Sequence, residues 1–247
     1  MQRSKKRRID QLLCELGLAE NADAAQRMVM AGTVVAGTHR VDKPGTLIDP
    51  ATPIRLKEQK QFVSRAGDKL RAALDAFPID VSGRVALDIG ASTGGFSDCL
   101  LQAGVARVYA LDVGKGLLDI RLRRDPRVVT LEGVHARNLS KDLVPDAIDL
   151  ATADVSFTSL RHVLPPVFKL MKNRGDLILL FKPQFEAPKN KVDTGGVVSD
   201  HQLRQDLLAS FATWLKRQGL SIRQHIDSPV LGRKSGNVEM LLWVRFD

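Results

Sequence analysis

Residues 85–97 read Val-Ala-Leu-Asp-Ile-Gly-Ala-Ser-Thr-Gly-Gly-Phe-Ser, and the fold class can be predicted from them. It predicts an apolar strand, a glycine-rich turn and the start of a helix, a unit that offers backbone N–H groups to a ligand. A second apolar run over 108–111 is followed by Asp112. An acid at the end of the second strand can hold both hydroxyls of a ribose. The two features together predict a nucleoside-cofactor site on a parallel sheet.

Strands and helices alternate after residue 60. The expected strands are 85–89, 108–111, 128–131, 150–153 and 176–181, and the expected helices are 96–103, 117–122 and 160–171. Such alternation predicts right-handed βαβ units and a parallel sheet. A capping box, Ser199-x-x-Gln202, opens a further helix to about Gln218. Two strand-like runs without a helix between them, 221–226 and 239–246, predict an antiparallel hairpin at the end of the sheet.

The first sixty residues predict a separate small module. One helix has apolar side chains at helical spacing from Ile9 and ends at Gly17, and a second is capped by Asn21 and ends at Gly32. Short strand-like pieces follow at 33–35, 40–41 and 54–56, and residues 58–61 form a polar linker. The expected domains are therefore residues 1–60 and 66–247, joined by a linker over 61–65.

The charge balance indicates a polyanionic partner. The chain has 37 Lys and Arg against 28 Asp and Glu, a net charge of +9. A solvated, disordered tail explains the basic first eight residues equally well. Only 5% of the residues are aromatic, so a base-stacking platform built from many aromatic side chains is not expected. The candidate phosphate contacts are Arg3, Lys5, Lys6, Arg7, Arg8, Arg27, Arg40 and Lys43.

Several classes of protein are disfavoured by composition. No apolar run approaches the roughly 20 residues of a membrane helix, and the basic N-terminus lacks the apolar stretch of a secretory signal. Cys14 and Cys99 lie far apart in the sequence, so a disulfide framework is not expected and a reducing cytoplasm fits. We predict no metal site, no membrane association and no obligate protein partner.

The glycine-rich turn indicates the kind of cofactor. Ser92 stands where the dinucleotide fingerprint Gly-x-Gly-x-x-Gly has its second glycine. The Lys-Ser/Thr pair of a P-loop is also missing after the turn, so binding of a pyrophosphate is disfavoured. S-adenosylmethionine has a ribose and a carboxylate but no phosphate. The alternative is that Gly94 and Gly95 only permit close packing of the helix on the strand. The expected cofactor-binding residues are Gly90, Ala91, Ser92, Thr93, Gly94, Gly95, Phe96, Asp112 and Val113.

Four polar side chains are expected to meet beside this cofactor, because sites on open α/β sheets lie at the carboxyl ends of the strands. Asp154 follows the fourth strand and Lys182 the fifth, Glu239 opens the last strand, and Lys69 precedes the first. Three of the four have a structural alternative. Lys69 and Lys182 can be solvated surface lysines, and Glu239 can cap a strand edge.

Taken as a set, the motifs resemble the TlyA family of ribosomal RNA 2′-O-ribose methyltransferases, also called hemolysins, over almost the whole chain. The first sixty residues resemble an S4 RNA-binding module, and the remainder resembles the wider FtsJ-type group, whose active site is a Lys-Asp-Lys-Glu tetrad. The motifs that carry the resemblance are Arg8-Ile-Asp-Gln-Leu12, Gly17-Leu-Ala19, Ala25-Gln-Arg27, Ala31-Gly32, Val41-Asp-Lys-Pro-Gly45, Val63-Ser-Arg-Ala-Gly67, Gly90-Ala-Ser-Thr-Gly-Gly-Phe96, Asp154-Val-Ser-Phe157, Lys182-Pro-Gln-Phe-Glu186 and Gly236-Asn-Val-Glu239.

The resemblance implies a fold and a reaction. The fold is a Rossmann-like class I S-adenosylmethionine-dependent methyltransferase, with a mostly parallel seven-stranded sheet, after a small α+β S4-like domain. The reaction is 2′-O-methylation of a ribose, a cytidine, in ribosomal RNA. The tetrad maps onto Lys69, Asp154, Lys182 and Glu239. Lys182 is the expected base for the 2′-hydroxyl, with Lys69 as a neighbouring cation and the two carboxylates as orienting groups.

The chain departs from the family at two places. Lys60-Gln-Phe-Val63 stands where the family often has Arg-x-Trp-Val, and the chain ends at Asp247, straight after the last strand. The short ending is similar to that of members restricted to the large subunit, which favours 23S rRNA. Residues 186–199 contain Pro188, Gly195 and Gly196, and are either a lid or a plain surface loop.

Three rival functions stay open. A base N-methyltransferase shares the fold, but its usual Asn/Asp-Pro-Pro-aromatic motif is absent after the fourth strand. A catalytically dead ribosome-assembly factor is disfavoured, because such a protein would not need the complete tetrad. A membrane-lytic hemolysin is disfavoured by the lack of a signal or a spanning segment.

Overall fold

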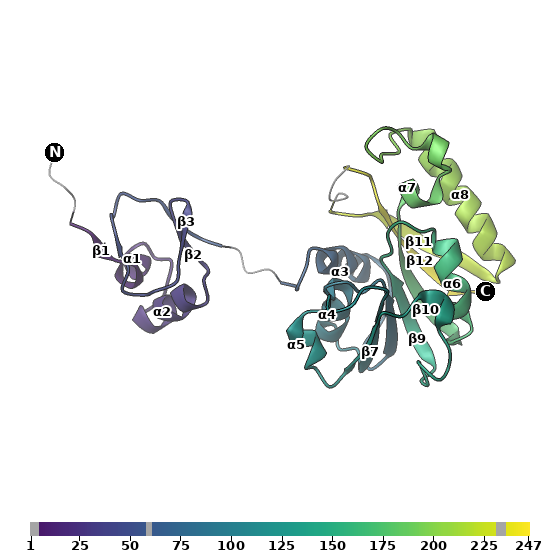
Figure 1. Cartoon of the computed structure of the whole chain (residues 1–247), viewed down its shortest axis with the longest axis horizontal. Coiled ribbons are helices and arrows are strands. Elements are labelled where there is room, and N and C mark those ends of the chain that lie inside the picture. The colour runs from purple at the N-terminus through teal and green to yellow at the C-terminus, as the bar shows by residue number, and fades with distance from the viewer. Residues whose placement is uncertain (1–4, 58–60, 231–235) are drawn as a thin grey trace. The chain divides into compact units, whose positions relative to one another are not determined.

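The computed structural model describes residues 5–57, 61–230 and 236–247 (Figure 1). The chain divides into two compact units, Met1–Lys60 and Gln61–Asp247, and each is described by itself. Arg3 and part of the expected polar linker, residues 58–60, lie outside the described residues.

The first unit contains the two expected helices, packed on short antiparallel strands. Asn21 caps the second helix as predicted, because its side chain accepts a 2.9 Å hydrogen bond from the N–H of Ala24. The core is formed by side chains such as Ile9, Leu13 and Val29, which are fully buried. The elements are β1 (Arg7–Arg8), α1 (Ile9–Glu15), α2 (Ala22–Met30), β2 (Val34–Ala36), β3 (His39–Val41), β4 (Leu47–Ile48) and β5 (Ile54–Leu56).

Two strands of this unit are not predicted by the sequence. Arg7 and Arg8 form β1, which pairs antiparallel with β4. A disordered basic tail is therefore the wrong interpretation for these two arginines. The remaining strands form a sheet in the order β3-β2-β5. The assignment of the unit as an S4 module stays a prediction.

The second unit is built on a seven-stranded sheet in the order β11-β12-β10-β9-β6-β7-β8. The strands β10, β9, β6, β7 and β8 run parallel, and β12 is antiparallel to both β10 and β11. The predicted parallel sheet with a terminal hairpin is confirmed. In chain order the elements are α3 (Ala66–Ala76), β6 (Val85–Ile89), α4 (Gly95–Gln102), β7 (Arg107–Asp112), α5 (Ile120–Arg123), β8 (Val128–Glu132), η1 (Ala136–Asn138), β9 (Ile148–Ala153), α6 (Leu160–Phe168), β10 (Met171–Phe181), α7 (Pro183–Glu186), η2 (Lys189–Lys191), α8 (His201–Arg217), β11 (Leu220–Asp227) and β12 (Met240–Phe246).

Helices cover both faces of the sheet because successive strand residues point to opposite faces. In β10, Leu177 and Leu179 pack with α6 and α8, whereas Ile178 and Leu180 pack with α3 and α4 (Figure 1). The parallel strands are thus buried on both sides, which explains why they appear in the sequence as short, nearly continuous apolar runs.

Three predicted boundaries are wrong. The expected helix over 117–122 is only α5, which begins at Ile120. The expected helix over 160–171 ends at Phe168, because Met171 already pairs with Ile148 at the start of β10. The expected strand over 176–181 is β10, which already begins at Met171. A register shift separates Met171 from Asp176, where the apolar part of the strand begins.

The capping box at Ser199 is also wrong. Asp200 caps α8, and its carboxylate accepts hydrogen bonds from the N–H groups of Gln202 and Leu203 at 2.8 and 3.2 Å. The Ser199 hydroxyl instead donates to Asp193. This bond lies within the loop 186–199, where Asp193 and Val197 form an isolated β-bridge.

The segment that begins the second unit is anchored to it. Phe62 is buried, and a Cβ atom at Gly67 in α3 would clash with its ring. The Val63 N–H donates to Asp98 in α4 at 2.8 Å. Residues expected as linker therefore pack with the second unit, and Phe62 takes a core position where the family often has Trp.

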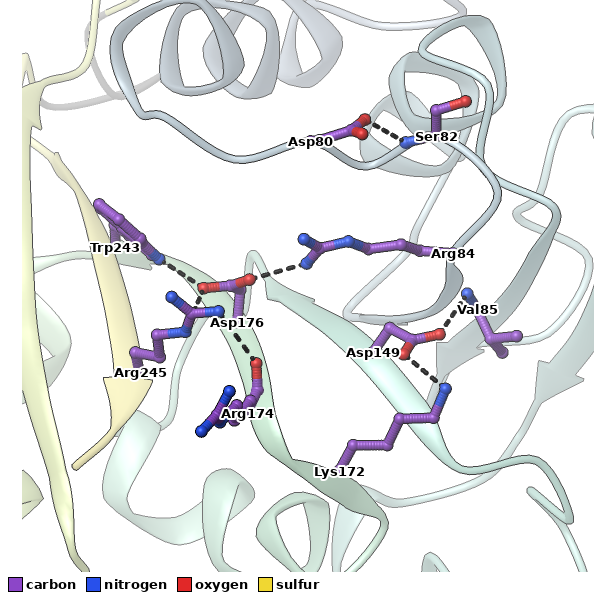
Figure 2. A network of polar contacts seen from close by, with 10 residues as sticks. All are labelled: Asp80, Ser82, Arg84, Val85, Asp149, Lys172, Arg174, Asp176, Trp243 and Arg245. Carbon is purple, nitrogen blue, oxygen red and sulfur yellow. Dashed lines mark hydrogen bonds and ion pairs between the residues drawn. The ribbon is translucent and has the colours of Figure 1, made fainter.

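A network of polar contacts ties the sheet together at the amino ends of its parallel strands (Figure 2). The carboxylate of Asp176 is 2% exposed. It accepts from Arg84 at 2.7 Å and from the Trp243 indole at 2.8 Å, and Arg245 lies 3.4 Å away. These contacts join β10, β12 and the residue before β6, at the edge of the sheet opposite to the carboxyl ends.

No helix within the described ranges is both long enough and apolar enough to cross a membrane.

Candidate active site

The site begins where the strand order reverses. The chain passes from β6 to β7 and β8 on one side and then crosses to β9 on the other side of β6. Open α/β sheets bind ligands at such a switch point. Gly90 follows β6 here with φ of +80°, and a Cβ atom on it would lie 2.5 Å from the carbonyl oxygen of Asp154. Glycine is required at this position by both its backbone conformation and the close approach of β9.

A pocket of about 520 Å³ opens at this switch point. Of the nine predicted cofactor residues, Gly90, Ser92, Asp112 and Val113 line it. The lining also includes residues from the ends of β6 and β7, the segment after β8 and the segment after β9: Ile89, Leu111, Leu117, Val134, His135, Ala136, Asp154, Val155, Ser156, Phe157, Thr158 and Val163.

The other five predicted cofactor residues are not among the lining of this pocket: Ala91, Thr93, Gly94, Gly95 and Phe96. A Cβ atom at Gly94 would clash with Leu122, and one at Gly95 would clash with Ser64. Phe96 is buried in the core. These two glycines permit close packing, and a contact of the five residues with the cofactor stays a prediction.

Asp112 lies at the end of β7 as predicted, with its carboxylate held by backbone donors. It accepts from the N–H of Ser92 at 2.8 Å and from that of Gly114 at 2.7 Å. Each carboxylate oxygen has a further lone pair, so the group can still accept two ribose hydroxyls. These two hydrogen bonds join the turn after β6 to the turn after β7.

Two of the polar residues that the sequence analysis misses near the pocket lie at or just after the end of β8. Glu132, at the end of β8, accepts hydrogen bonds from the N–H groups of residues 116, 117 and 118. The Arg123 guanidinium and these N–H groups lower the pKa of the Glu132 carboxyl to about 2. The loop that contributes Val113 and Leu117 is thus fixed by an acid on the neighbouring strand.

His135 is the second missed residue. Its Nδ1 accepts from the N–H of Arg137 at 3.2 Å, so in the neutral ring Nε2 carries the proton. The signal in the sequence was its position just after the third parallel strand. That position belongs to the same edge of the sheet as Asp112.

The sheet register brings three of the four predicted catalytic residues together. Phe181 pairs with Met240, so Lys182 and Glu239 occupy the adjoining ends of β10 and β12. Asp154 directly follows Ala153, the last residue of β9 to pair with β10. All three lie at the carboxyl edge of the parallel strands.

Two ion pairs join the four residues two by two, and one of the pairs is buried while the other is partly buried. Lys69, on α3, donates to Glu239 at 2.5 Å, and Lys182 donates to Asp154 at 2.5 Å. The two lysines are 9% and 7% exposed, and Glu239 is 4% exposed. The alternatives of solvated lysines and a strand-edge glutamate are therefore wrong.

Lys182 makes two further contacts. Its Nζ donates to the hydroxyl of Ser156 at 3.1 Å and lies 5.9 Å from the centre of the Phe185 ring. Phe157 packs against Phe185 with ring centres 5.4 Å apart. The Phe157 side chain is 92% exposed, and its φ of +64° is rare for a residue with a side chain. An aromatic surface thus borders both Lys182 and the pocket.

Asp88 lies inside the sheet, within the strand that leads to the pocket. It accepts hydrogen bonds from Ser97 at 2.7 Å and Thr152 at 2.9 Å. Burial raises the pKa of its carboxyl to about 6. It ties β6 to α4 and β9 rather than contacting the pocket.

The predicted phosphate contacts of the first unit fall into two groups. Arg7 pairs with Glu15, and Arg8 pairs with Asp10 at 2.6 Å, which lowers the pKa of the Asp10 carboxyl. The other described members are exposed, and within residues 5–57 none of them forms an ion pair. These members are Lys5, Lys6, Arg27, Arg40 and Lys43.

The sheet order and the pocket at its switch point define a class I methyltransferase that uses S-adenosylmethionine. The pocket suits this cofactor, since its walls are largely apolar and Asp112 lies where a ribose is held. The chain belongs to the FtsJ-like methyltransferase family, which matches residues 62–246, and within it to the TlyA group. The family predicted from the motifs is confirmed.

Three relatives illustrate this membership. The chain is 42% identical to a candidate rRNA methyltransferase, YqxC of Bacillus subtilis, over 97% of this chain and 85% of the relative. It is 41% identical to the 16S/23S rRNA (cytidine-2′-O)-methyltransferase TlyA of Mycobacterium tuberculosis, over 98% and 91%. A solved structure of a candidate hemolysin from Streptococcus thermophilus superposes with a TM-score of 0.74, at 38% identity over 98% and 89% of the two chains.

Proposed function

We propose that this protein transfers a methyl group from S-adenosylmethionine to the 2′-hydroxyl of a cytidine ribose in ribosomal RNA. The observation that carries the proposal is the presence of two ion pairs, the buried Lys69–Glu239 and the partly buried Lys182–Asp154, at the carboxyl edge of the sheet. The name of the Mycobacterium tuberculosis relative supports the cytidine and the 2′-oxygen.

Each side chain of the tetrad has a distinct role in this proposal. When bound, S-adenosylmethionine supplies a methyl group on a sulfonium, whose sulfur keeps the electron pair of the breaking C–S bond. Lys182 takes the proton of the 2′-hydroxyl as the new O–C bond forms. Asp154 orients the Lys182 amine, and Glu239 holds Lys69 as the neighbouring cation. Much of the acceleration comes from in-line positioning, because the leaving group is already activated.

The cofactor lies against the ends of β6 and β7 in this proposal. Asp112 accepts the two ribose hydroxyls, while Gly90 and Ser92 approach with their backbone. Val134, His135 and Ala136 contribute the wall after β8. Gly94 and Gly95 permit close packing of the turn.

The RNA contacts are shared between the two units. The exposed cations of the first unit contact phosphates, which gives affinity without sequence choice. In the second unit, the exposed Phe157 ring offers a stacking surface for a base next to Lys182. The expectation of 23S rRNA as the substrate stays a prediction, and we take it as the first RNA to test.

Replacing Lys182 tests the catalytic proposal. Lys182→Ala should reduce methyl transfer by at least about 10²-fold, the usual contribution of a positioned base, and should leave S-adenosylmethionine binding intact. Transfer is measured with labelled cofactor on rRNA, and cofactor affinity by calorimetry. The matched control is Lys172→Ala, which removes a lysine paired with Asp149 at the opposite edge of the sheet. Near-normal turnover of Lys182→Ala would reject the base role.

The position of the methyl group separates the rival functions. A 2′-O-methyl group blocks alkaline cleavage at its own linkage, whereas a methyl group on the base does not. Mapping alkali-resistant positions in both rRNAs therefore distinguishes ribose from base methylation and shows which subunit is modified. A protein that binds the ribosome but not S-adenosylmethionine would instead be an assembly factor.

A further inference from the structure

The strongest unassigned feature of the site is the hydroxyl of Ser156. This residue follows Asp154 by two positions and is exposed, yet its Oγ accepts a hydrogen bond from the buried Lys182 ammonium at 3.1 Å. It also lines the cofactor pocket, as Asp154 does. Ser156 therefore stands between the pocket and the amine that the proposed function uses as its base.

The contact with Ser156 restricts the orientation of a neutral Lys182 amine. A neutral lysine amine has two N–H hydrogens and one lone pair, arranged tetrahedrally. Asp154 and Ser156 are two acceptors at hydrogen-bond distance, and together they take both hydrogens. The lone pair is then confined to the remaining direction. With only Asp154 as acceptor, the amine could rotate about its last bond and the lone pair would lose its fixed direction.

The turn that carries Ser156 is itself held in an uncommon shape. Phe157, the next residue, has φ of +64°, a conformation that costs energy for a residue with a side chain. Its ring packs against Phe185, three residues beyond Lys182. The aromatic pair thus fixes the turn of Ser156 to the segment of Lys182 from the outside.

We propose that Ser156 is a positioning residue that aims the lone pair of Lys182 at the 2′-hydroxyl. This inference rests on the proposed function, because it assigns Ser156 a role only if Lys182 is the base. Ser156 itself exchanges no proton with the substrate: it accepts one N–H of Lys182 before and after the transfer. Its contribution is therefore to the rate of the chemical step rather than to the affinity for cofactor or RNA.

Two variants of Ser156 test the proposal in the full-length protein. Ser156→Ala removes the acceptor, and we expect single-turnover methyl transfer at saturating cofactor and RNA to fall roughly 10- to 100-fold, the cost of a misaligned reacting group. The affinities for S-adenosylmethionine and for a 23S rRNA transcript should change less than threefold. Ser156→Thr keeps the hydroxyl and should restore most of the rate, since the added methyl group sits on an exposed residue.

The matched control is Ser221→Ala, which removes a serine hydroxyl bonded to Asp247 at the far edge of the sheet and should leave the rate unchanged. Unfolding temperatures of all variants verify the fold. A normal rate for Ser156→Ala overturns the inference, and so does an equal loss in Ser156→Thr or a loss confined to cofactor affinity. Near-normal transfer by Lys182→Ala would instead reject Lys182 as the base, and methylation of a base rather than a ribose would show that the proposed function is wrong, so these failures are distinguishable.

Discussion

Asp88 carries a carboxyl group into a part of the sheet that solvent does not reach. Its side chain is 0% exposed, and its two hydrogen bonds come from the neutral hydroxyls of Ser97 and Thr152. No cation contacts it within the described residues, so desolvation outweighs these bonds and raises the pKa to about 6, from an ordinary value of 3.8. The fold thus opposes the ionisation of Asp88.

This residue makes stability depend on pH in an unusual direction. Between pH 3.8 and about 6 the folded protein holds a proton on Asp88 that the unfolded chain has lost. The free energy of unfolding contributed by Asp88 therefore falls as the pH rises through this interval. Asp88→Asn cannot ionise and keeps the shape, so its stability relative to wild type should improve from pH 4 to pH 6. Urea denaturation at several pH values measures this difference.

Asp125 provides a control of opposite sign. Its hydrogen bonds with Arg127 lower the pKa of its carboxyl, so its stabilising contribution is lost as the pH falls. Asp125→Asn should therefore lose stability relative to wild type near neutral pH and less so in acid. Equal pH dependences for Asp88→Asn and wild type would show that Asp88 is not held protonated.

At the scale of elements, the loop between β7 and α5 depends on a contact from the next strand. Glu132 accepts from three successive N–H groups of this loop and from Arg123 at 2.6 Å. The carboxylate satisfies these backbone donors and keeps Leu117 in the pocket wall. We expect Glu132→Gln to weaken S-adenosylmethionine binding roughly three- to tenfold, since an amide offers one acceptor oxygen and no charge.

Calorimetric titration with the cofactor measures this effect. Glu20→Gln in the first unit makes the same chemical change at an exposed position and should leave the cofactor affinity unaltered. The rate of methyl transfer at saturating cofactor should be close to wild type for both variants, because the loop holds the cofactor rather than the base. An unchanged affinity for Glu132→Gln would mean that the loop keeps its shape without the carboxylate.

The elements differ in how well the sequence predicts them. The strand Val85–Ile89 is predicted with its observed bounds, because an apolar run flanked by glycine is decided locally. The helix over 117–122 is mispredicted at its start, since the N–H groups of Leu117 and Leu118 donate to Glu132 on a strand, a partner that periodicity cannot reveal. Ser199 fails for a similar reason: its hydroxyl bonds to Asp193, which leaves the cap to Asp200.

At the scale of the whole molecule, the candidate site depends on contacts between distant parts of the chain. Lys69 has the local pattern of a solvated helix residue, and only Glu239, 170 positions later, makes it a buried partner. The positions of the four residues near strand ends predicted that they meet, and the motif resemblance implied the same four residues, but neither predicted which lysine pairs with which carboxylate. Glu132 lies in none of the quoted motifs. Ser156 lies within Asp154-Val-Ser-Phe157, but its hydrogen bond with Lys182 depends on a residue 26 positions later and could not be predicted from the motif.

Ion pairs within the first unit predict which of its cations contact RNA. Arg8 is already paired with Asp10, whereas Arg27 and Arg40 form no ion pair within residues 5–57. A cation that neutralises a phosphate releases counterions, so its removal lowers the salt dependence of binding. Arg27→Gln and Arg40→Gln should each reduce the slope of log K against log salt by about 0.7 to 0.9. Filter binding of a 23S rRNA transcript between low and high salt measures the slope.

Arg8→Gln separates direct contact from overall charge, because it changes the net charge of the chain by the same amount as Arg27→Gln or Arg40→Gln. Its guanidinium would have to leave Asp10 before it could neutralise a phosphate, and the abandoned carboxylate would then repel the RNA. The slope of Arg8→Gln should therefore stay nearer to wild type than those of Arg27→Gln and Arg40→Gln. Identical slopes for all three variants would mean that the RNA responds to the net charge of +9 rather than to particular side chains.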